Sequence, residues 1–370
     1  MANKRGRIDY WLFLVVFILV CIGLVMVLSA SQYTAAYDKG DSYYYLKRQL
    51  INGALGLVAM FFAINIDYHA YGKMHNIIFY TGVGLMLIGM LTNLGDTGGA
   101  GEGSKRWLQI AGFRFQPSDV MKLSMLVQIS YLLAHRKKPF KSFIHDFVPY
   151  LCFTGFCCGL VAVMDLGTGI AMGITLMLLF LIVGVPKRYL LGLVTAALGA
   201  VAVLIIWKPY RIKRLTSFLD PWADYYNNGY QVIQSLLAIG SGGLMGVGLG
   251  NGGAKWYYLP DQHTDFIFAT LVEEGGFLAG LVVLLLFLAF TWRGLTIALK
   301  VNDYFGSLLA TGLTLLISVQ ALVNIAVTLS LMPVTGIPLP FISYGGTSLV
   351  ISLAAVGVLL NISRHAKLEK

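Results

Sequence analysis

Long apolar runs alternate with short polar segments along the whole chain. About 20 apolar residues in a helix rise far enough to cross the hydrocarbon core of a bilayer. We predict ten such helices at roughly 10–30, 47–66, 74–92, 118–135, 147–164, 168–185, 188–207, 265–291, 304–330 and 346–362. The predicted fold class is therefore an all-α polytopic membrane protein in which residues 1–370 form a single transmembrane domain.

Composition supports this prediction. The 370 residues are 57% hydrophobic and only 12% charged, against about 25% charged residues in soluble domains. The four cysteines fall inside apolar runs and form no CxxC pair, which is typical of packing residues rather than metal ligands. The first run exceeds the 7–15 residues or so of a signal peptide, so we interpret it as an uncleaved span.

The basic residues predict an orientation. Lysines and arginines of the short loops place the N-terminus in the cytoplasm, and an even number of spans places the C-terminus there too. The two longer outer loops, about 93–117 and 208–264, are nevertheless basic; they carry Lys105, Arg106, Arg114, Lys208, Arg211, Lys213, Arg214 and Lys255. Cations on the outer side favour an anionic ligand such as a pyrophosphate, or attraction to lipid headgroups.

The segment 103–123, GSKRWLQIAGFRFQPSDVMKL, ends the first outer loop. Its KRWLQI portion predicts a short helix or strand at the membrane interface. Ser118 suits the N-cap of the next span and Asp119 suits its first turn. Asp119 and Lys122 are three residues apart and share a helix face, so they can pair. The alternative is a cap and a lysine that reaches out to the interface.

Two further segments combine glycine with polar residues. Asp165 in MDLGTG lies between two short apolar helices, where it either caps the second helix or has a function. The stretch GYQVIQSLLAIGSGGLMGVGLGNGG predicts a short amphipathic helix followed by a glycine-rich loop. Glycine lets the backbone approach a ligand closely, and a flexible linker is the alternative.

The segment YYLPDQHTDFIFATLVEEGG places a carboxylate where the chain enters the eighth span. Asp265, beside His263, suits a general base or a cation ligand. Glu273 and Glu274 follow deeper in the same helix, where they need partners inside the protein. The alternative is an N-cap at Thr264 with Asp265 stabilising the helix dipole, which accounts for Asp265 but not for the two glutamates.

The segment LMPVTGIPLPFISYGGTS, 331–348, predicts a rigid outer loop before the last span. Ser343 and Tyr344 could offer hydroxyl groups to a polar ligand. A plain turn and a re-entrant loop are the alternatives. Asn324 is an isolated polar residue in the ninth span, and we interpret it as a helix–helix contact.

These segments together resemble the SEDS family (shape, elongation, division and sporulation) over nearly the whole chain. The motifs are KRWLQIAGFRFQPSD, DLGTG, YRIKRLTSFLDPW, GYQVIQSLLAIGSGGLMGVGLG, LPDQHTDFIFA followed by EE, and PVTGIPLPFISYGGTS. The segment RIKRLTSFLDPW and the GLGN sequence look more like the division and sporulation branch (FtsW, SpoVE) than the elongation branch (RodA). Asp119 departs from the family pattern, which usually has Glu there, and VMDLGT and EEGG are further departures.

The resemblance implies a ten-span peptidoglycan glycosyltransferase of the bacterial cytoplasmic membrane. Its substrate would be lipid II, a disaccharide-pentapeptide on a polyprenyl pyrophosphate, and its partners a class B penicillin-binding protein and other division-complex membrane proteins. The family's essential acid matches Asp265, which would act as general base, directly or through Mg²⁺ or Mn²⁺. The expected substrate-binding residues are Arg106, Trp107, Asp119, Lys122, Asp165, Arg211, Gln234, His263 and Ser343.

Two other functions fit the residues. A lipid II flippase would also need intramembrane charges and basic outer loops, but the sequence shows no matching polar set at the inner face and no inverted repeat. A scaffold that only holds the penicillin-binding protein would not need Asp265. Nothing in the sequence indicates binding to nucleic acid.

Overall fold

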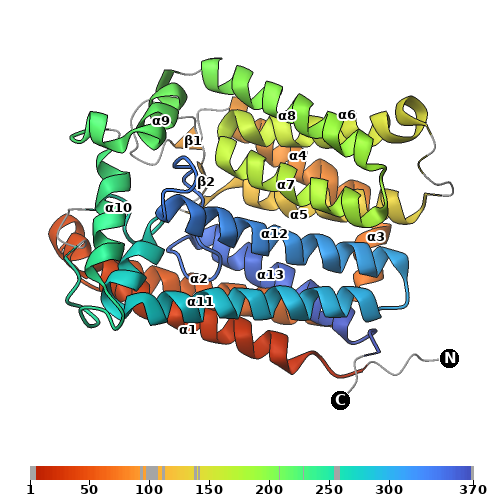
Figure 1. Cartoon of the computed structure of the whole chain (residues 1–370). Helices are drawn as coiled ribbons and strands as arrows, with labels where there is room; N and C mark the ends of the chain where they lie inside the picture. The colour runs from red at the N-terminus through yellow and green to blue at the C-terminus, as the bar shows by residue number, and fades with distance from the viewer. Residues whose placement is uncertain are drawn as a thin grey trace.

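The computed structural model describes residues 6–91, 95–96, 107–110, 113–136, 140, 142–207, 209–227, 229–253 and 259–367. Ten long helices in this part of the chain run roughly parallel (Figure 1). They are α1 (Tyr10–Lys39), α2 (Tyr44–Asn65), α4 (His75–Leu91), α5 (Pro117–Ala134), α6 (Val148–Met164), α7 (Leu166–Val183), α8 (Lys187–Trp207), α11 (Ile267–Lys300), α12 (Tyr304–Thr328) and α13 (Gly346–Ser363).

Each predicted span coincides with one of these helices, which confirms the helical polytopic fold. In the described ranges, 8 helices are long and apolar enough to cross a membrane, counting η1 (Phe143–Phe147) with α6. The 17-residue helix α4 is shorter, and α5 is outside that set because Asp119 and Lys122 make it more polar. Two spans were predicted to end too early, since α1 continues to Lys39 and α11 continues to Lys300.

The two longer loops, which were predicted to lie on the outer side, contain secondary structure of their own. The first holds a small antiparallel sheet in the order β1 (Gly95–Asp96), β2 (Trp107–Ile110) and β3 (Phe113–Phe115), so the KRWLQI segment includes a strand. The second holds α9 (Pro209–Leu219), η2 (Pro221–Asp224) and α10 (Tyr230–Ser241). The predicted amphipathic helix is confirmed as α10, whereas α9 was not predicted.

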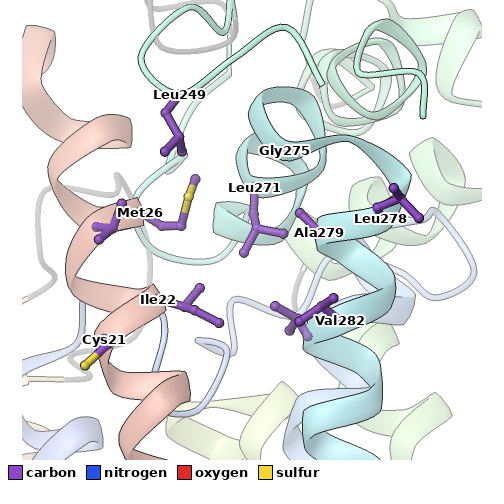
Figure 2. Close-up of a pocket in the computed structure, with 11 residues that line it drawn as sticks. Cys21, Ile22, Met26, Leu249, Leu271, Gly275, Leu278, Ala279 and Val282 are labelled. Atoms are coloured by element: carbon purple, nitrogen blue, oxygen red, sulfur yellow. The ribbon is translucent and has the colours of Figure 1, made fainter. Parts of the chain in front are cut away.

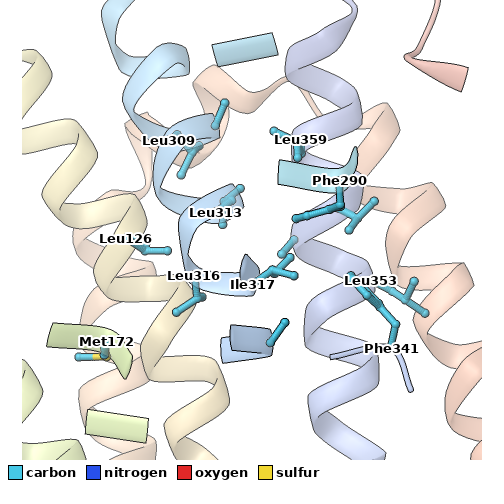
Figure 3. Close-up of a cluster of buried hydrophobic side chains, with 14 of the residues drawn as sticks. Leu126, Met172, Phe290, Leu309, Leu313, Leu316, Ile317, Phe341, Leu353 and Leu359 are labelled. Atoms are coloured by element: carbon cyan, nitrogen blue, oxygen red, sulfur yellow. The ribbon is translucent and has the colours of Figure 1, made fainter. Parts of the chain in front are cut away.

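Helix α12 forms the centre of the bundle, and nearly all of its residues are buried. It packs against α5, α7, α11 and α13. Figure 3 shows Leu313, Leu316 and Ile317 of α12 surrounded by apolar side chains of those neighbours, including Leu126 and Phe290. A helix that is buried on all sides needs no polar face, so each polar residue on it must have a partner within the protein.

The ends of the bundle differ. The first and last described segments of the chain lie at one end, and α9, α10 and the sheet lie at the other (Figure 1). At the end with the termini, the Gly6 amide donates to the Arg364 carbonyl at 3.0 Å, and Arg293 forms an ion pair with Asp9. The Asp9 amide donates to Ser363 Oγ at 3.0 Å. An ion pair and backbone contacts therefore tie the first and last described segments together at this end.

Candidate functional site

Asp265 lies in the last turn before α11, a helix that packs against α10. The amides of Thr264 and Phe266 both donate to the Asp261 carbonyl, at 3.0 and 3.3 Å. The helix begins at Ile267 with Phe266 as its N-cap residue, so the alternative that placed the cap at Thr264 is wrong. The aromatic ring of Phe266 is fully buried and anchors the turn, while Asp265 stays partly exposed.

A second loop, which precedes α13, holds this turn in place. The Ser343 hydroxyl donates to the Thr264 carbonyl at 2.6 Å and accepts from the Leu339 amide at 2.7 Å. The Tyr344 amide donates to the His263 carbonyl at 2.9 Å. Ser343 is buried and its hydroxyl binds the protein itself, so the structure gives this residue a positioning contact beside Asp265.

Two polar residues on α12 connect the Asp265 turn to Lys122. The Asn324 amide group donates to the Asp265 carbonyl at 2.7 Å and to the Ile337 carbonyl at 2.8 Å. The Lys122 ammonium donates to Gln320 Oε1 at 3.1 Å. Gln320 and Asn324 are four residues apart and lie one above the other on the same helix face. Asn324 thus binds loop carbonyls, and its interpretation as a helix–helix contact is wrong.

Asp119 pairs with Lys122, which is one of the two arrangements that the sequence left open. The Lys122 ammonium lies 2.7 Å from Asp119 Oδ1, and the two side chains are only 7% and 4% exposed. The Thr347 hydroxyl donates to Asp119 Oδ2 at 3.3 Å. Asp119 is in the first turn of α5, but the N-cap residue is Gln116 and not Ser118. Proline 117 takes the first helical position, for which its fixed φ is suited.

Asp165 caps α7, which is one of the two roles that the sequence left open, and it also belongs to the same network. Its carboxylate accepts from the Thr168 amide at 3.3 Å and from the Thr168 hydroxyl at 2.9 Å. The Gln116 side chain donates to Asp165 Oδ2 at 3.2 Å, and the Gln116 amide donates to the Thr347 hydroxyl at 3.2 Å. Gln116, Gln320 and Thr347 were missed from the sequence, although a glutamine inside an apolar helix is itself a signal.

His263 is packed between aromatic rings. Its ring centroid lies 4.5 Å from that of Tyr45 and 5.7 Å from that of Tyr344. Burial lowers the pKa of His263 to about 4, although the carboxylates of Asp261 and Asp38 oppose the shift. The imidazole is therefore uncharged at neutral pH, so His263 can contribute shape and a hydrogen bond to the site but no positive charge.

Glu273 and Glu274 are buried and have partners in the protein, as the sequence required. Glu273 Oε1 accepts from the Gly253 amide at 2.7 Å. Glu274 Oε2 accepts from the Ser29 hydroxyl of α1 at 2.5 Å. The two acids therefore join α11 to α1 and to the glycine-rich loop that follows α10.

The glycine-rich loop donates hydrogen bonds to helix α11 at the point where that helix is interrupted. Gly276 has φ 74° and ψ −177°, which interrupts the helix. The amides of Val247 and Gly248 donate to the carbonyls of Glu273 and Glu274, both at 3.0 Å. Backbone at membrane depth must be satisfied within the protein. The glycines of this loop thus allow its backbone to approach helix α11 closely, and not a ligand.

Replacing Gly246 by alanine should disrupt this junction. Its φ is 81°, and an added Cβ would lie 2.1 Å from the Glu274 carbonyl oxygen. Gly243 is the matched control, because it also has positive φ (52°) but has no atom within 4 Å of an added Cβ. We expect Gly246→Ala to lower the thermal unfolding midpoint far more than Gly243→Ala, whose strain alone is about 1 kcal/mol. Equal unfolding midpoints for the two variants would show that the contact between this loop and α11 does not stabilise the fold.

The remaining predicted residues are placed as follows. Trp107 lies in β2 and Gln234 in α10, both half-buried, and neither forms a hydrogen bond with the described members of the Asp119–Lys122 network. Arg106 lies outside the described residues, and only the backbone of Arg211 is described. Within the described ranges, no group of three or more histidine, cysteine, aspartate or glutamate side chains is arranged to hold a metal ion.

An apolar groove of about 490 Å³ separates α1 from α11 (Figure 2). Cys21, Ile22 and Met26 line it from α1, and Leu271 and Ala279 are among the residues that line it from α11. Leu249 of the glycine-rich loop covers its upper end in Figure 2. The groove thus extends from the helix break along two helices of the bundle.

A family model described as cell cycle protein, FtsW/RodA/SpoVE, matches residues 10–368. The chain belongs to this family. It is 42% identical over 375 residues to stage V sporulation protein E of Bacillus subtilis, covering 99% of this chain and 100% of that protein. It is 40% identical to the probable peptidoglycan glycosyltransferase FtsW of a Geobacter species (strain M18), with 95% of each chain covered.

Solved structures agree with this membership. A chain from a peptidoglycan synthase complex, studied for its coordination of polymerization and crosslinking, superposes with a TM-score of 0.78 at 28% identity over 96% of this chain and 98% of that one. The rod shape determining protein RodA of Thermus thermophilus gives a TM-score of 0.72 at 25% identity, with 98% of each chain covered. The fold is therefore that of the SEDS proteins, and the sporulation and division relatives have the higher identities.

Proposed function

We propose that this family member is a peptidoglycan glycosyltransferase that polymerises lipid II at the outer face of the cytoplasmic membrane. One observation carries the proposal. A single face of α12 binds the Asp265 turn through Asn324 and, one helical turn away, the Lys122 ammonium through Gln320. The backbone of the turn that carries the partly exposed Asp265 and the buried Lys122 cation are therefore both held by one helix face.

The reaction that suits this pair is glycosyl transfer from a lipid pyrophosphate. Asp265 takes the proton of the acceptor's 4-hydroxyl while the oxygen forms a bond to the anomeric carbon of the donor glycan. The bond from that carbon to the pyrophosphate breaks with inversion, and the electron pair leaves on the lipid pyrophosphate. Lys122, together with Arg106 and Arg211 of the outer loops, would stabilise the growing negative charge.

A divalent cation such as Mg²⁺ or Mn²⁺ would be shared between Asp265 and the substrate. Mg²⁺ is usually bound by one or two carboxylates together with substrate phosphates, not by a cage of protein ligands alone. One carboxylate beside an incoming pyrophosphate fits that pattern. The cation would supply positive charge to the leaving group.

The groove between α1 and α11 suits an isoprenoid tail of the substrate. Ala279→Trp should fill it and raise the KM for long-chain lipid II about tenfold, equivalent to about 1.4 kcal/mol, with a much smaller effect on a short-chain analogue. Leu288→Trp is the control, since Leu288 is an exposed side chain of α11 that does not line the groove. Equal KM values for both variants would exclude the isoprenoid tail as the occupant of the groove. If Ala279→Trp instead prevented a partner protein from binding through its transmembrane helix in the purified complex, the groove would be assigned to that partner.

Both termini are placed in the cytoplasm by this proposal, which matches the basic short loops. The structure supports it in that the described ends of the chain lie together, away from α9 and α10 (Figure 1). A class B penicillin-binding protein would be the partner that crosslinks the product. Thiol labelling of intact cells, with single cysteines placed at residue 8 and in η2, would report on the orientation.

Purified protein and fluorescent lipid II provide the direct test. We expect glycan polymer, resolved on a gel and digestible by a muramidase, with more product when the penicillin-binding protein is added. Movement of labelled lipid II across vesicles without polymer would instead identify a flippase. Growth that survives loss of Asp265 would identify a scaffold.

A further inference from the structure

The segment from η2 to the first residue of α10 exposes aromatic side chains that the proposed reaction does not use. Trp222, Tyr225, Tyr226 and Tyr230 lie here, and we call these four residues the aromatic platform. Trp222 is 63% exposed and Tyr226 is 86% exposed. Aromatic rings offer about 150–250 Å² each for burial, so exposed rings grouped together indicate a surface that binds something.

The rings of the platform share a defined arrangement. Trp222 and Tyr225 are stacked, with centroids 6.0 Å apart and planes inclined by 21°. Tyr225 meets Tyr226 and Tyr230 edge-on, at centroid distances of 5.0 and 6.4 Å. Because pyranose rings have an apolar face of C–H groups and a rim of hydroxyls, they pack well on such aromatic faces.

Local hydrogen bonds hold the platform in shape. Asp220 caps η2 by accepting from the Ala223 amide at 3.2 Å. The Asn227 side chain donates to Asp224 Oδ1 at 2.9 Å, and the Gly229 amide donates to the Asp224 carbonyl at 3.0 Å. A surface that is already ordered loses little conformational entropy when a ligand binds.

Charge distinguishes the ligand that this surface suits. The sequence from 215 to 254 has no lysine, arginine or histidine. Its acidic residues in that stretch are Asp220 and Asp224. Arg211, Lys213 and Arg214 of α9 lie before this stretch, but the charged groups closest to the rings in the sequence are the carboxylates of Asp220 and Asp224, which disfavour direct contact of the rings with an anion. Carboxylate and amide groups are, however, good partners for sugar hydroxyls. The surface therefore fits the uncharged sugar backbone of a glycan, with its peptide stems directed away from the rings, better than an anionic lipid surface.

The platform is attached directly to the loops of the candidate site. Gln231 donates to the Pro260 carbonyl at 3.4 Å, five residues before Asp265. Ser235 donates to the Thr328 carbonyl at 2.8 Å, and Arg214 of α9 donates to the Val334 carbonyl at 3.2 Å. The elements that flank the platform are therefore tied to the loop that carries Asp265 and to the loop that follows α12.

We infer that the aromatic platform binds the glycan strand outside the reaction site, so that the strand is retained between successive additions. This inference rests on the proposed polymerase function for its role, but the binding itself does not require catalysis. Trp222 provides the main stacking face, and Tyr226 extends it.

Direct binding can be measured on the full-length protein in detergent. Soluble β-1,4-linked N-acetylglucosamine oligomers serve as the probe, and the Asp265→Asn form can be used so that catalysis plays no part. We expect Trp222→Ala and Tyr226→Ala each to weaken binding about tenfold or more, and Trp222→Tyr to retain most of it. Trp292→Ala is the matched control, since Trp292 is 68% exposed but lies on α11 toward the other end of the bundle.

Polymer length provides the second measurement. With active protein and lipid II, Trp222→Ala should shorten the glycan product several-fold relative to wild type and to Trp292→Ala. Unchanged oligomer binding and unchanged glycan length in Trp222→Ala would overturn the inference. A Trp222→Ala protein that loses only its affinity for anionic vesicles would also overturn it, because the platform would then be a membrane anchor. Absence of polymer from the wild-type protein would count against the proposed function, while oligomer binding would still test the platform.

Discussion

Asp265→Asn should reduce lipid II polymerisation by about 10²–10⁴-fold, the usual contribution of a general base. The amide has nearly the same shape as the carboxylate, but it cannot accept the acceptor's proton, and its uncharged oxygen binds a divalent cation much more weakly. The backbone contact from Asn324 to the Asp265 carbonyl is unaffected by the substitution, so the turn should keep its place. Initial rates of polymer formation with purified protein, with and without divalent cation, measure the effect.

Asp261→Asn is the control for that experiment. Asp261 is an exposed carboxylate four residues earlier in the same turn, and its φ of 53° is one that asparagine adopts readily. We expect its rate to stay within about twofold of wild type. Polymer at a normal rate from Asp265→Asn, with an unchanged unfolding midpoint and partner binding, would falsify the role of Asp265 as the base.

Lys122→Met should produce the largest loss of stability together with a loss of activity. Lys122 is almost fully buried and neutralises the Asp119 carboxylate at 2.7 Å. Removing one member of a buried ion pair typically costs about 3–5 kcal/mol, because the other charge stays buried without compensation. The unfolding midpoint in detergent and the polymerisation rate should both fall.

A double variant separates the two roles of Lys122. In Asp119→Asn/Lys122→Met no buried charge is left uncompensated, so much of the lost stability should return. Activity should not return if the ammonium also stabilises the leaving pyrophosphate. Recovery of both properties would show that Lys122 is only structural. Lys47→Met, which breaks an exposed ion pair of 2.8 Å with Asp41, should leave the midpoint unchanged.

Features that depend on neighbouring residues were predictable from the sequence. The spans follow from runs of apolar residues, and the Asp119–Lys122 pair follows from a separation of three residues on a helix. The cap at Asp165 is equally local. Recognition of the family added Asp265 through a motif, because spacing alone left a helix-dipole role as an alternative.

Only the tertiary structure showed what surrounds those residues. Gln320 and Asn324 bind Lys122 and the Asp265 turn, which lie roughly 200 and 60 residues away in the chain, and no local periodicity encodes such pairs. The glycine-rich loop could have contacted a ligand or nothing, and it contacts the broken helix α11. Hydropathy and helical spacing thus determined which segments enter the membrane, whereas packing around α12 decided which polar groups meet, because each buried donor must find an acceptor wherever the fold places one.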